Sequence, residues 1–341
     1  MRILVDVTHP AHVHFFRSAI KLWQQHGHEV AVTARRKDVT VELLENFNIP
    51  FTTLSEAGKG LFGLFGEMLR RDVKLLRFCK AFKPDVLTAI GGVYAAHVGF
   101  LLRKPVVVWD DTEVATIGHK LTHPFAKWIM SPDCYTKDLG KKQKRYAGLH
   151  ELAYLHPNRF TPDAAVVKSL GIDPSEKYCL LRFVSWQAHH DVGQYGFDNR
   201  QKEKIIQELS KYAKVYITAE GSIPEQLKKY QLKIPVHLIH HVLAFAKLYI
   251  GEGATMATEG GLLGVPAVYV NSLQSGNMNM LANYGLLNQT TDAQEILKLS
   301  VQWLTDPQVS SKCSAARQKL LDSTIDVTEF VVATIEKAVV E

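Results

Sequence analysis

Residues 248–270 read LYIGEGATMATEGGLLGVPAVYV and carry the strongest signal in the chain. The apolar run over 248–251 is typical of a buried strand, and the run over 266–270 is typical of a second one. A glycine-rich turn and a helical segment lie between them. This strand–turn–helix–strand order predicts two parallel strands joined by a helix, which is the repeating unit of an α/β fold.

The same alternation extends toward both ends of the chain. Helical spacing of Phe16, Ile20 and Trp23 follows the first apolar run. The pattern weakens between about 140 and 175, where a basic run and several prolines lie. Further strands are predicted at 3–7, 29–33, 85–90, 104–109, 178–183 and 214–218. We therefore predict two open α/β domains that face each other across a cleft, with a boundary near residue 158.

Composition supports a globular protein of this size. The chain has 341 residues, of which 46% are hydrophobic and 22% are charged, and its net charge is +6. That charge suits an anionic or phosphorylated partner without requiring one. The cysteines form no CxxC pair, so neither a zinc site nor a disulfide framework is indicated, and a reducing cytoplasm is expected.

Two features bear on targeting and membranes. An acid at position 6 argues against a signal peptide that begins at Met1. Residues 86–102 are uncharged, but this run is short for a membrane span and contains Gly91-Gly92, so a strand, a glycine turn and a helix explain it better.

The glycine turn over 251–261 follows a strand and opens a helix. Small residues there allow backbone N–H groups to approach a phosphate, and the helix N-terminus adds a favourable field. Glu259, one turn further on, is placed to accept hydrogen bonds from ribose hydroxyls. The alternative is a tight turn whose glycines serve packing alone.

The loop after the first strand contains Thr8, His9, Pro10, His12 and His14. Because histidine titrates near neutrality, a general base is expected here. A metal site that also used 189–191 and 240–241 is a second interpretation. In the third, His12 or His14 caps the following helix or packs beneath the phenylalanines that begin it.

Two further strand ends are expected to line the same cleft. The segment that begins at Arg182, at the end of the strand at 178–183, is expected to bind substrate. In it Ser185 and the nearby backbone can donate to a phosphate, Trp186 can stack on a base or fill the hinge, and His189 and Asp191 can orient one another. After the strand at 85–90, Gly91 and Gly92 allow a ligand to come close. One strand later, the segment 110–113 contains candidate acids at Asp110, Asp111 and Glu113, although acids are also favoured at a helix N-terminus without any function.

Residues 58–83 combine two phenylalanines near glycines with a predicted basic helix. Phe62 and Phe65 stand beside glycines, and arginines and lysines follow them. This pattern is typical of a surface that touches an anionic membrane. An ordinary amphipathic helix with a solvated basic face is the alternative.

Three segments together resemble one known family, DUF354. They are 6–16 (DVTHPAHVHFF), 182–186 (RFVSW) and 251–256 (GEGATM), and the similarity spans essentially the full chain. That family resembles the GT-B fold of nucleotide-sugar glycosyltransferases and UDP-N-acetylglucosamine 2-epimerases. The resemblance implies two Rossmann-like domains: 1–158 on the acceptor side, with a last helix at about 328–341 packing back on it, and 159–327 for the nucleotide sugar.

The resemblance also implies roles for individual residues. Gly253, Ala254, Thr255 and Met256 match the phosphate-binding turn, and Glu259 matches the ribose-binding carboxylate. His241 and Val242 would contact the base, while His9 and His12 would face the acceptor and the anomeric carbon. No metal or other cofactor is implied, because backbone dipoles and positive side chains stabilise the leaving diphosphate.

We therefore expect a glycosyltransferase that uses a nucleotide diphosphate sugar, most simply a UDP-sugar, and a lipid-linked or glycan acceptor in surface polysaccharide or glycolipid biosynthesis. An epimerase resembling UDP-N-acetylglucosamine 2-epimerase is the alternative. Epimerases carry an acid after the strand at 85–90, where this chain has Gly91-Gly92-Val93, so Asp111 or Glu113 would have to replace it. A metal hydrolase and a non-catalytic nucleotide-binding or nucleic-acid-binding protein are further alternatives, but few aromatics accompany basic residues outside 62–78, so no nucleic-acid partner is expected.

Overall fold

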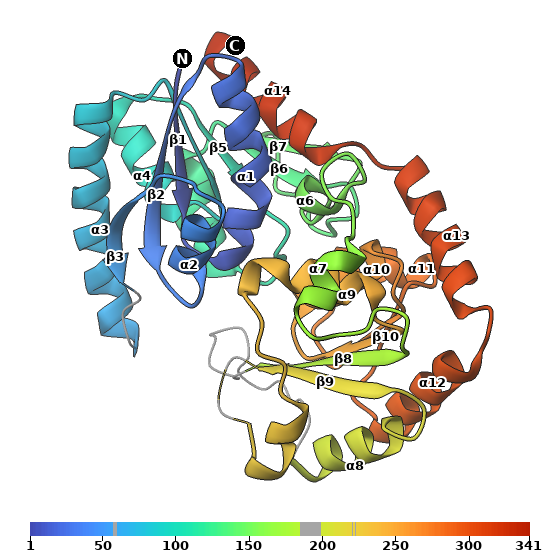
Figure 1. The fold of residues 1–341 in the computed structure, drawn as a ribbon. Coiled ribbons are helices and arrows are strands. Elements are labelled where there is room, and N and C mark those ends of the chain that lie inside the picture. The colour runs from blue at the N-terminus through green and yellow to red at the C-terminus, as the bar shows by residue number, and fades with distance from the viewer. Residues whose placement is uncertain (57–59, 185–198, 220, 222) are drawn as a thin grey trace. The chain divides into compact units, whose positions relative to one another are not determined.

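The computed structural model describes residues 1–56, 60–184, 199–219, 221 and 223–341, with the backbone alone at 60–65 and 199. The chain forms two compact units (Figure 1). One comprises Met1–Arg159 together with Ile325–Glu341, and the other comprises Phe160–Thr324. Each unit is built around its own parallel sheet.

The first unit contains a seven-stranded parallel sheet. Its strand order is β3-β2-β1-β4-β5-β6-β7. The order reverses between β1 and β4, and in such sheets ligands bind beyond the carboxyl ends of the strands next to the reversal. The strands are β1 (Arg2–Val7), β2 (Glu29–Arg36), β3 (Thr52–Glu56), β4 (Val86–Ile90), β5 (Val106–Trp109), β6 (Trp128–Pro132) and β7 (Gln143–Tyr146).

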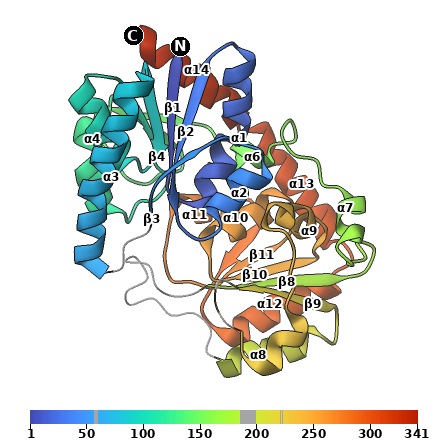
Figure 2. The same cartoon turned by 60° about the vertical axis from the view of Figure 1, so that its left-hand side comes forward.

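Helices cover both faces of this sheet (Figure 2). On one face lie α3 (Gly60–Phe82), α4 (Val93–Leu102), α5 (Thr116–Thr122) and the short η1 (His123–Phe125). On the other face lie α1 (Pro10–Gln25), α2 (Thr40–Asn46), α6 (Leu152–Leu155) and α14 (Val327–Val340). Because both faces are buried, β5 and the Ile3–Val5 part of β1 are continuous apolar runs rather than alternating ones.

The last helix, α14, belongs to the N-terminal sheet rather than to the unit that precedes it in sequence. The indole Nε1 of Trp23 in α1 donates to the carbonyl of Val332 at 3.5 Å, and the hydroxyl of Thr328 donates to the carbonyl of Ala153 at 2.5 Å. Val331 and Ile335 are fully buried. These contacts bind the end of the described chain to its beginning.

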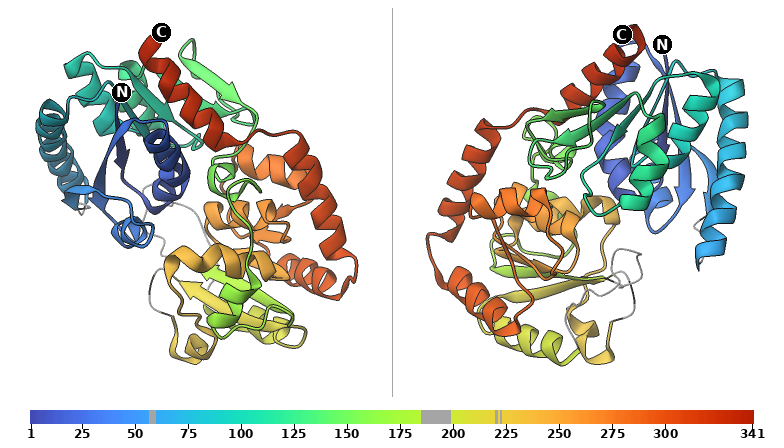
Figure 3. Two further views of the ribbon diagram at one scale, coloured as in Figure 1. Left: turned by 45° about the horizontal axis from the view of Figure 1, so that its top comes forward. Right: turned by 180° about the vertical axis from the view of Figure 1, so that it is seen from behind.

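The second unit contains a five-stranded parallel sheet, of which Figure 3 gives two further views. Its order is β12-β11-β10-β8-β9. The strands are β8 (Tyr178–Phe183), β9 (Lys214–Ala219), β10 (Leu248–Gly251), β11 (Ala267–Tyr269) and β12 (Leu287–Gln289). The helical elements are α7 (Ala164–Ser169), α8 (Asn199–Leu209), η3 (Glu225–Tyr230), η4 (Val236–Leu238), α9 (Ile239–Phe245), α10 (Ala254–Leu262), α11 (Gly276–Asn283), α12 (Ala293–Thr305) and α13 (Val309–Asp322).

The predicted α/β class, with two parallel sheets, is confirmed. The sequence did not predict β3, β6, β7 and β12. The basic run at 141–145 was assigned to a region of weak pattern, yet it overlaps β7, an edge strand whose charged residues suit the edge of a sheet. Among the described residues, no helix has the length and apolar character needed to cross a membrane.

Candidate functional site

The loop after β1 is shaped by the start of α1. His9 is the N-cap residue, and its Nδ1 accepts a hydrogen bond from the amide of Ala11 at 3.3 Å. Pro10 occupies the first helical position, where its missing N–H costs nothing. The capping role proposed for His12 or His14 therefore belongs to His9, and His14 is buried.

His12 is also held through Nδ1. This nitrogen accepts from the amide of Thr8 at 3.3 Å and lies 3.5 Å from the Thr8 hydroxyl. Burial, with a smaller contribution from His9, holds the pKa of His12 well below its usual value. A neutral imidazole that accepts at Nδ1 carries its proton on Nε2, so this geometry makes His12 a hydrogen-bond donor rather than a general base.

Asp111 follows β5 and pairs with a histidine that the sequence did not single out. Its Oδ2 lies 3.1 Å from Nδ1 of His150. Burial alone would raise the pKa of Asp111, but the charge and hydrogen bond of His150 outweigh it and the pKa is lowered. Asp111 raises the pKa of His12 and His150 lowers it, so these side chains are near enough to act on one another.

Sequence reasoning missed His150 because no local pattern marks it. It lies between β7 and α6 as a single histidine between Leu149 and Glu151. The ring of Phe15 packs edge-on against it, with centroids 4.8 Å apart, and Tyr146 stacks parallel to it. Its Nε2 is buried without a hydrogen-bond partner among the described residues.

Asp110 faces a different set of groups. Its Oδ2 lies 2.8 Å from Nε2 of His119 and 3.1 Å from Nε2 of His123. Burial opposes ionisation, but the two imidazoles and the amide of Thr112 together lower the pKa of Asp110 to about 2. The two histidine rings stack with centroids 4.6 Å apart. The three ligand atoms are close enough to hold a metal ion, and without one they fix the segment between β5 and η1.

Glu113 is buried and accepts from the amide of Thr136 at 3.3 Å, which ties it to the segment after β6. His12 is thus within electrostatic range of His9, Asp111 and His150, whereas the Glu113 carboxylate accepts hydrogen bonds from Thr136.

The glycine pair after β4 has a backbone explanation. Gly91 and Gly92 have φ values of 65° and 67°, a region that other residues rarely occupy. A Cβ on Gly92 would lie 2.8 Å from Cγ1 of Val108, whereas a Cβ on Gly91 would meet open space. Packing thus requires glycine at 92, and only Gly91 has room beside it for a ligand.

In the second unit, β10 leads into the glycine turn and α10. Gly253 is the N-cap of α10, and Ala254, Thr255 and Met256 form its first turn. All four residues are half-buried, so the turn is reachable. The first-turn amides of a helix have no intrahelical acceptor and favour an anion.

The residues around this turn are more deeply placed. Glu259 is buried on α10, and its Oε1 lies 2.9 Å from Nε2 of His240. Nδ1 of His241 accepts from the amide of Asp163 at 3.1 Å. Val242 is fully buried, and its carbonyl accepts from the hydroxyl of Tyr178.

The end of β8 is joined to the end of β10. The amide of Val184 donates to Oε2 of Glu252 at 3.0 Å, and the amide of Glu252 donates to the carbonyl of Arg182 at 3.3 Å. Arg182 is half-buried. The predicted ligand contacts of Ser185, Trp186 and His189 lie outside the described residues.

A family described as "Protein of unknown function (DUF354)" matches residues 1–335. The chain belongs to the DUF354 family. A relative of this DUF354 protein, an uncharacterized protein from Methanocaldococcus jannaschii, is 25% identical over 86% of this chain and 89% of the relative. Another is a UDP-N-acetylglucosamine–N-acetylmuramyl-(pentapeptide) pyrophosphoryl-undecaprenol N-acetylglucosamine transferase from Pediococcus pentosaceus, 24% identical over 80% of this chain and 78% of the relative.

Solved structures place this DUF354 protein in the GT-B fold of two Rossmann-like domains. The UDP-GlcNAc 2-epimerase from Neisseria meningitidis bound to UDP-GlcNAc matches with a TM-score of 0.72 and 14% identity, over 99% of this chain and 100% of that one. MurG from Acinetobacter baumannii matches with a TM-score of 0.62 and 18% identity, over 99% and 100% of the two chains. At these identities the similarity shows the fold, and proteins of this fold include both transferases and epimerases.

Proposed function

We propose that this protein is a GT-B glycosyltransferase that transfers a sugar from a nucleotide diphosphate donor, a UDP-sugar, to a lipid-linked or glycan acceptor in surface polysaccharide or glycolipid biosynthesis. The observation that carries the proposal is the reachable turn at the start of α10, whose first-turn residues are all small or flexible. It provides amides and a helix N-terminus for the diphosphate. Solved structures similar to this chain include proteins bound to UDP-GlcNAc and to UDP, which supports this donor class.

In this proposal the second unit holds the donor. The amides of Ala254, Thr255 and Met256 bind the diphosphate and stabilise the charge that develops as the sugar departs. The Glu259 carboxylate proposed to bind the ribose also contacts His240. We propose that Glu259 keeps this contact with His240 while it accepts hydrogen bonds from the ribose. His241 and Val242 stay proposed neighbours of the base, Val242 through its backbone because its side chain is buried.

The first unit supplies groups for the acceptor. His9 and His12 each accept a hydrogen bond from a backbone amide at Nδ1, which places the ring proton on Nε2, and we propose that these N–H groups orient the acceptor or the sugar. Asp111, kept ionised by His150, is the proposed proton acceptor for the acceptor hydroxyl. Its side chain is 21% exposed, so a substrate oxygen can reach it. The general-base role considered for His12 thus passes to Asp111.

Charge placed on the first turn of α10 tests donor binding without threatening the fold. Ala254→Glu puts an anion where the helix dipole favours it, so stability holds or rises, while the same anion repels a diphosphate. We expect UDP affinity, measured by calorimetry, to fall at least about tenfold, with the isosteric Ala254→Gln as the control. Unchanged UDP affinity in a folded Ala254→Glu protein would remove the proposed donor site.

Turnover distinguishes the transferase from the epimerase. Gly91 and Gly92 connect β4 to α4, which begins at Val93. This connection holds no carboxylate, which favours a transferase over an epimerase. Release of UDP from a UDP-sugar panel should require an acceptor. Incorporation of solvent deuterium at sugar C2 without any acceptor would identify an epimerase instead.

We also propose that the α3–α4–α5 face of the first unit touches an anionic membrane. Leu69 and Val73 on α3, Phe100 and Leu101 on α4, and Ile117 on α5 are 47–75% exposed. His97 joins these helices, since its ring nitrogens lie 2.9 Å from Asp72 and 3.1 Å from the carbonyl of Leu121. These helices and the C-cap of α4 also carry exposed basic residues, namely Arg70, Arg77, Lys80, Arg103 and Lys120. The side chains of Phe62 and Phe65 lie outside the described residues.

A further inference from the structure

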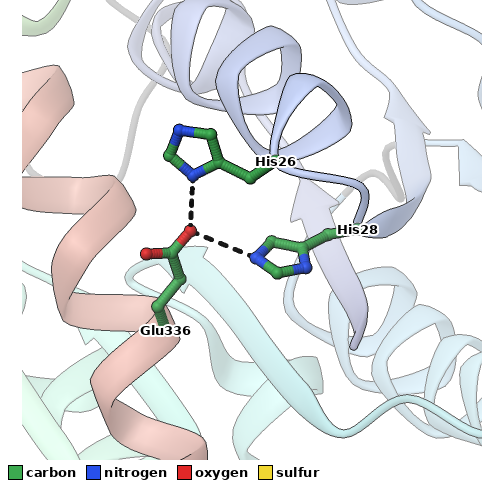
Figure 4. A group of neighbouring side chains, drawn as sticks. All are labelled: His26, His28 and Glu336. Carbon is green, nitrogen blue, oxygen red and sulfur yellow. Dashed lines mark hydrogen bonds and ion pairs between the residues drawn. The ribbon is translucent and has the colours of Figure 1, made fainter.

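A cluster of two histidines and a glutamate lies away from the sites described above (Figure 4). His26 ends α1, His28 precedes β2, and Glu336 projects from α14. Oε1 of Glu336 lies 2.8 Å from Nδ1 of His26 and 3.1 Å from Nε2 of His28. Figure 4 shows both rings directed at this one oxygen.

Backbone geometry on both sides fixes the three side chains. Gly27, with φ of 77°, makes the turn that puts His26 and His28 on either side of it, and the amide of His28 donates to the carbonyl of Trp23 at 2.9 Å. On the other side, Nζ of Lys127 donates to the carbonyl of Ala338 and holds the last turns of α14 in place. Nδ1 of His28 lies 3.3 Å from the amino nitrogen of Met1, which keeps Nε2 turned toward Glu336.

We propose that Nδ1 of His26, Nε2 of His28 and Oε1 of Glu336 bind one zinc ion, with water in the fourth position. The three atoms lie within 4.8 Å of one another. Oε1 of Glu336 lies 2.8 Å and 3.1 Å from the two nitrogens, close to the separation of about 3.4 Å between ligands around tetrahedral zinc at bond lengths near 2.1 Å. Two imidazoles and one carboxylate form a donor set that suits zinc.

Exposure at this cluster is consistent with a site that keeps a water ligand. The side chains of His26, His28 and Glu336 are 48%, 19% and 34% exposed. A bound ion would therefore reach solvent on one side and protein on the other. Because its ligands come from the end of α1, the start of β2 and α14, it would join segments that are separated by almost the whole chain.

The consequence is a metal-dependent clasp on the first unit. A ligand that binds only the folded state stabilises it in proportion to the logarithm of its concentration over Kd. At one hundred times Kd, zinc should raise the unfolding midpoint of the first unit by roughly 5–10 °C. This role is independent of sugar transfer, so the clasp and the proposed function succeed or fail separately.

A second group in the described residues, Asp110 with His119 and His123, has ligand atoms equally close together. It provides the matched control. His26→Ala and Glu336→Gln each remove one ligand from the proposed clasp, whereas His119→Ala removes one from the other group. The side chains of His26, Glu336 and His119 are all partly exposed, so the variants are expected to fold. Thermal unfolding of each metal-free variant is first compared with that of the metal-free wild type.

The test uses the full chain, purified without a polyhistidine tag and freed of metal by chelation. Titration with zinc chloride by calorimetry should show one equivalent whose affinity is at least tenfold weaker in His26→Ala and Glu336→Gln and unchanged in His119→Ala. A second equivalent that only His119→Ala loses would belong to the Asp110 group. Cobalt(II) in place of zinc should give the visible absorption of a tetrahedral site, lost in the same two variants. The proposal is overturned if the wild-type chain binds no stoichiometric zinc, or if the only equivalent bound is one that His119→Ala loses and His26→Ala and Glu336→Gln retain.

Discussion

Nδ1 of His150 lies 3.1 Å from Oδ2 of Asp111, and this pair gives the loop after β5 an ionised carboxylate that a substrate can reach. The two residues come from separate strand connections that the parallel sheet brings to one edge. The histidine has no hydrogen-bond partner at Nε2 among the described side chains.

Removing His150 should move the acid limb of the activity profile. The pKa of Asp111 is lowered in the folded protein, so Asp111 stays ionised, and its pairing stabilises the fold, until the pH falls through that lowered value. His150→Gln should raise the pKa of Asp111. At pH values below that pKa, each increase of one unit in the pKa of Asp111 should reduce kcat/KM for UDP release roughly tenfold. Asp111→Asn serves as the reference, since it should abolish the limb together with most activity. An acid limb at the same pH in His150→Gln and wild type would show that Asp111 is not the titrating base.

His12 should act as a donor across neutral pH. Its pKa is well below the usual range because of burial, so no change of charge occurs near pH 6.5. His12→Ala should reduce kcat by about a hundredfold, as loss of an oriented donor does, while His12→Gln should recover part of the rate through its amide N–H. The measurement is the pH profile of kcat for the three proteins. If the wild-type pH profile of kcat has an inflection near pH 6.5 that disappears in both variants, His12 acts as a general base and the proposed donor role is wrong.

The glycine pair after β4 offers a matched test of strain against packing. Gly91→Ala places a side chain at φ 65° in open space and should destabilise the first unit by about 1 kcal/mol. Gly92→Ala has the same strain and also brings its Cβ to 2.8 Å from Val108, so about 3 kcal/mol is expected. Urea unfolding followed by tryptophan fluorescence compares the two. Equal losses would show that Val108 moves aside freely.

Membrane contact should depend on the exposed residues of α4. Phe100 and Leu101 are 60% and 64% exposed, and replacing both with serine should reduce binding to anionic vesicles at least about tenfold, because each inserted apolar side chain contributes a few kcal/mol. Vesicle flotation is the assay. Tyr212→Ser, an exposed aromatic of the second unit, controls for general loss of apolar surface. If the double variant floats as the wild type does, this face is not the contact.

The periodic features of the sequence were enough to predict the strands that form the centre of each sheet. Runs such as 3–7 and 248–251 are buried on both faces of their sheets, and a strand buried in this way is rich in apolar residues, which makes it easy to recognise in a sequence. The edge strand β7 was missed for the opposite reason, since its sequence QKRY is mostly polar and resembles a loop. The glycine turn before α10 was also predicted, because its backbone demands small residues within a few positions.

Local pattern alone thus determined the α/β class, two parallel sheets and the half-buried turn at Gly253–Met256. Tertiary structure decided which side chains meet: His150 with Asp111, His240 with Glu259, and the histidines beside Gly27 with Glu336. It also decided which nitrogen of His12 carries the proton, since that depends on the Thr8 amide. The physical reason is that strand and helix formation follow from neighbouring residues, whereas pairing between distant side chains depends on how the folded sheet brings their loops and helices together.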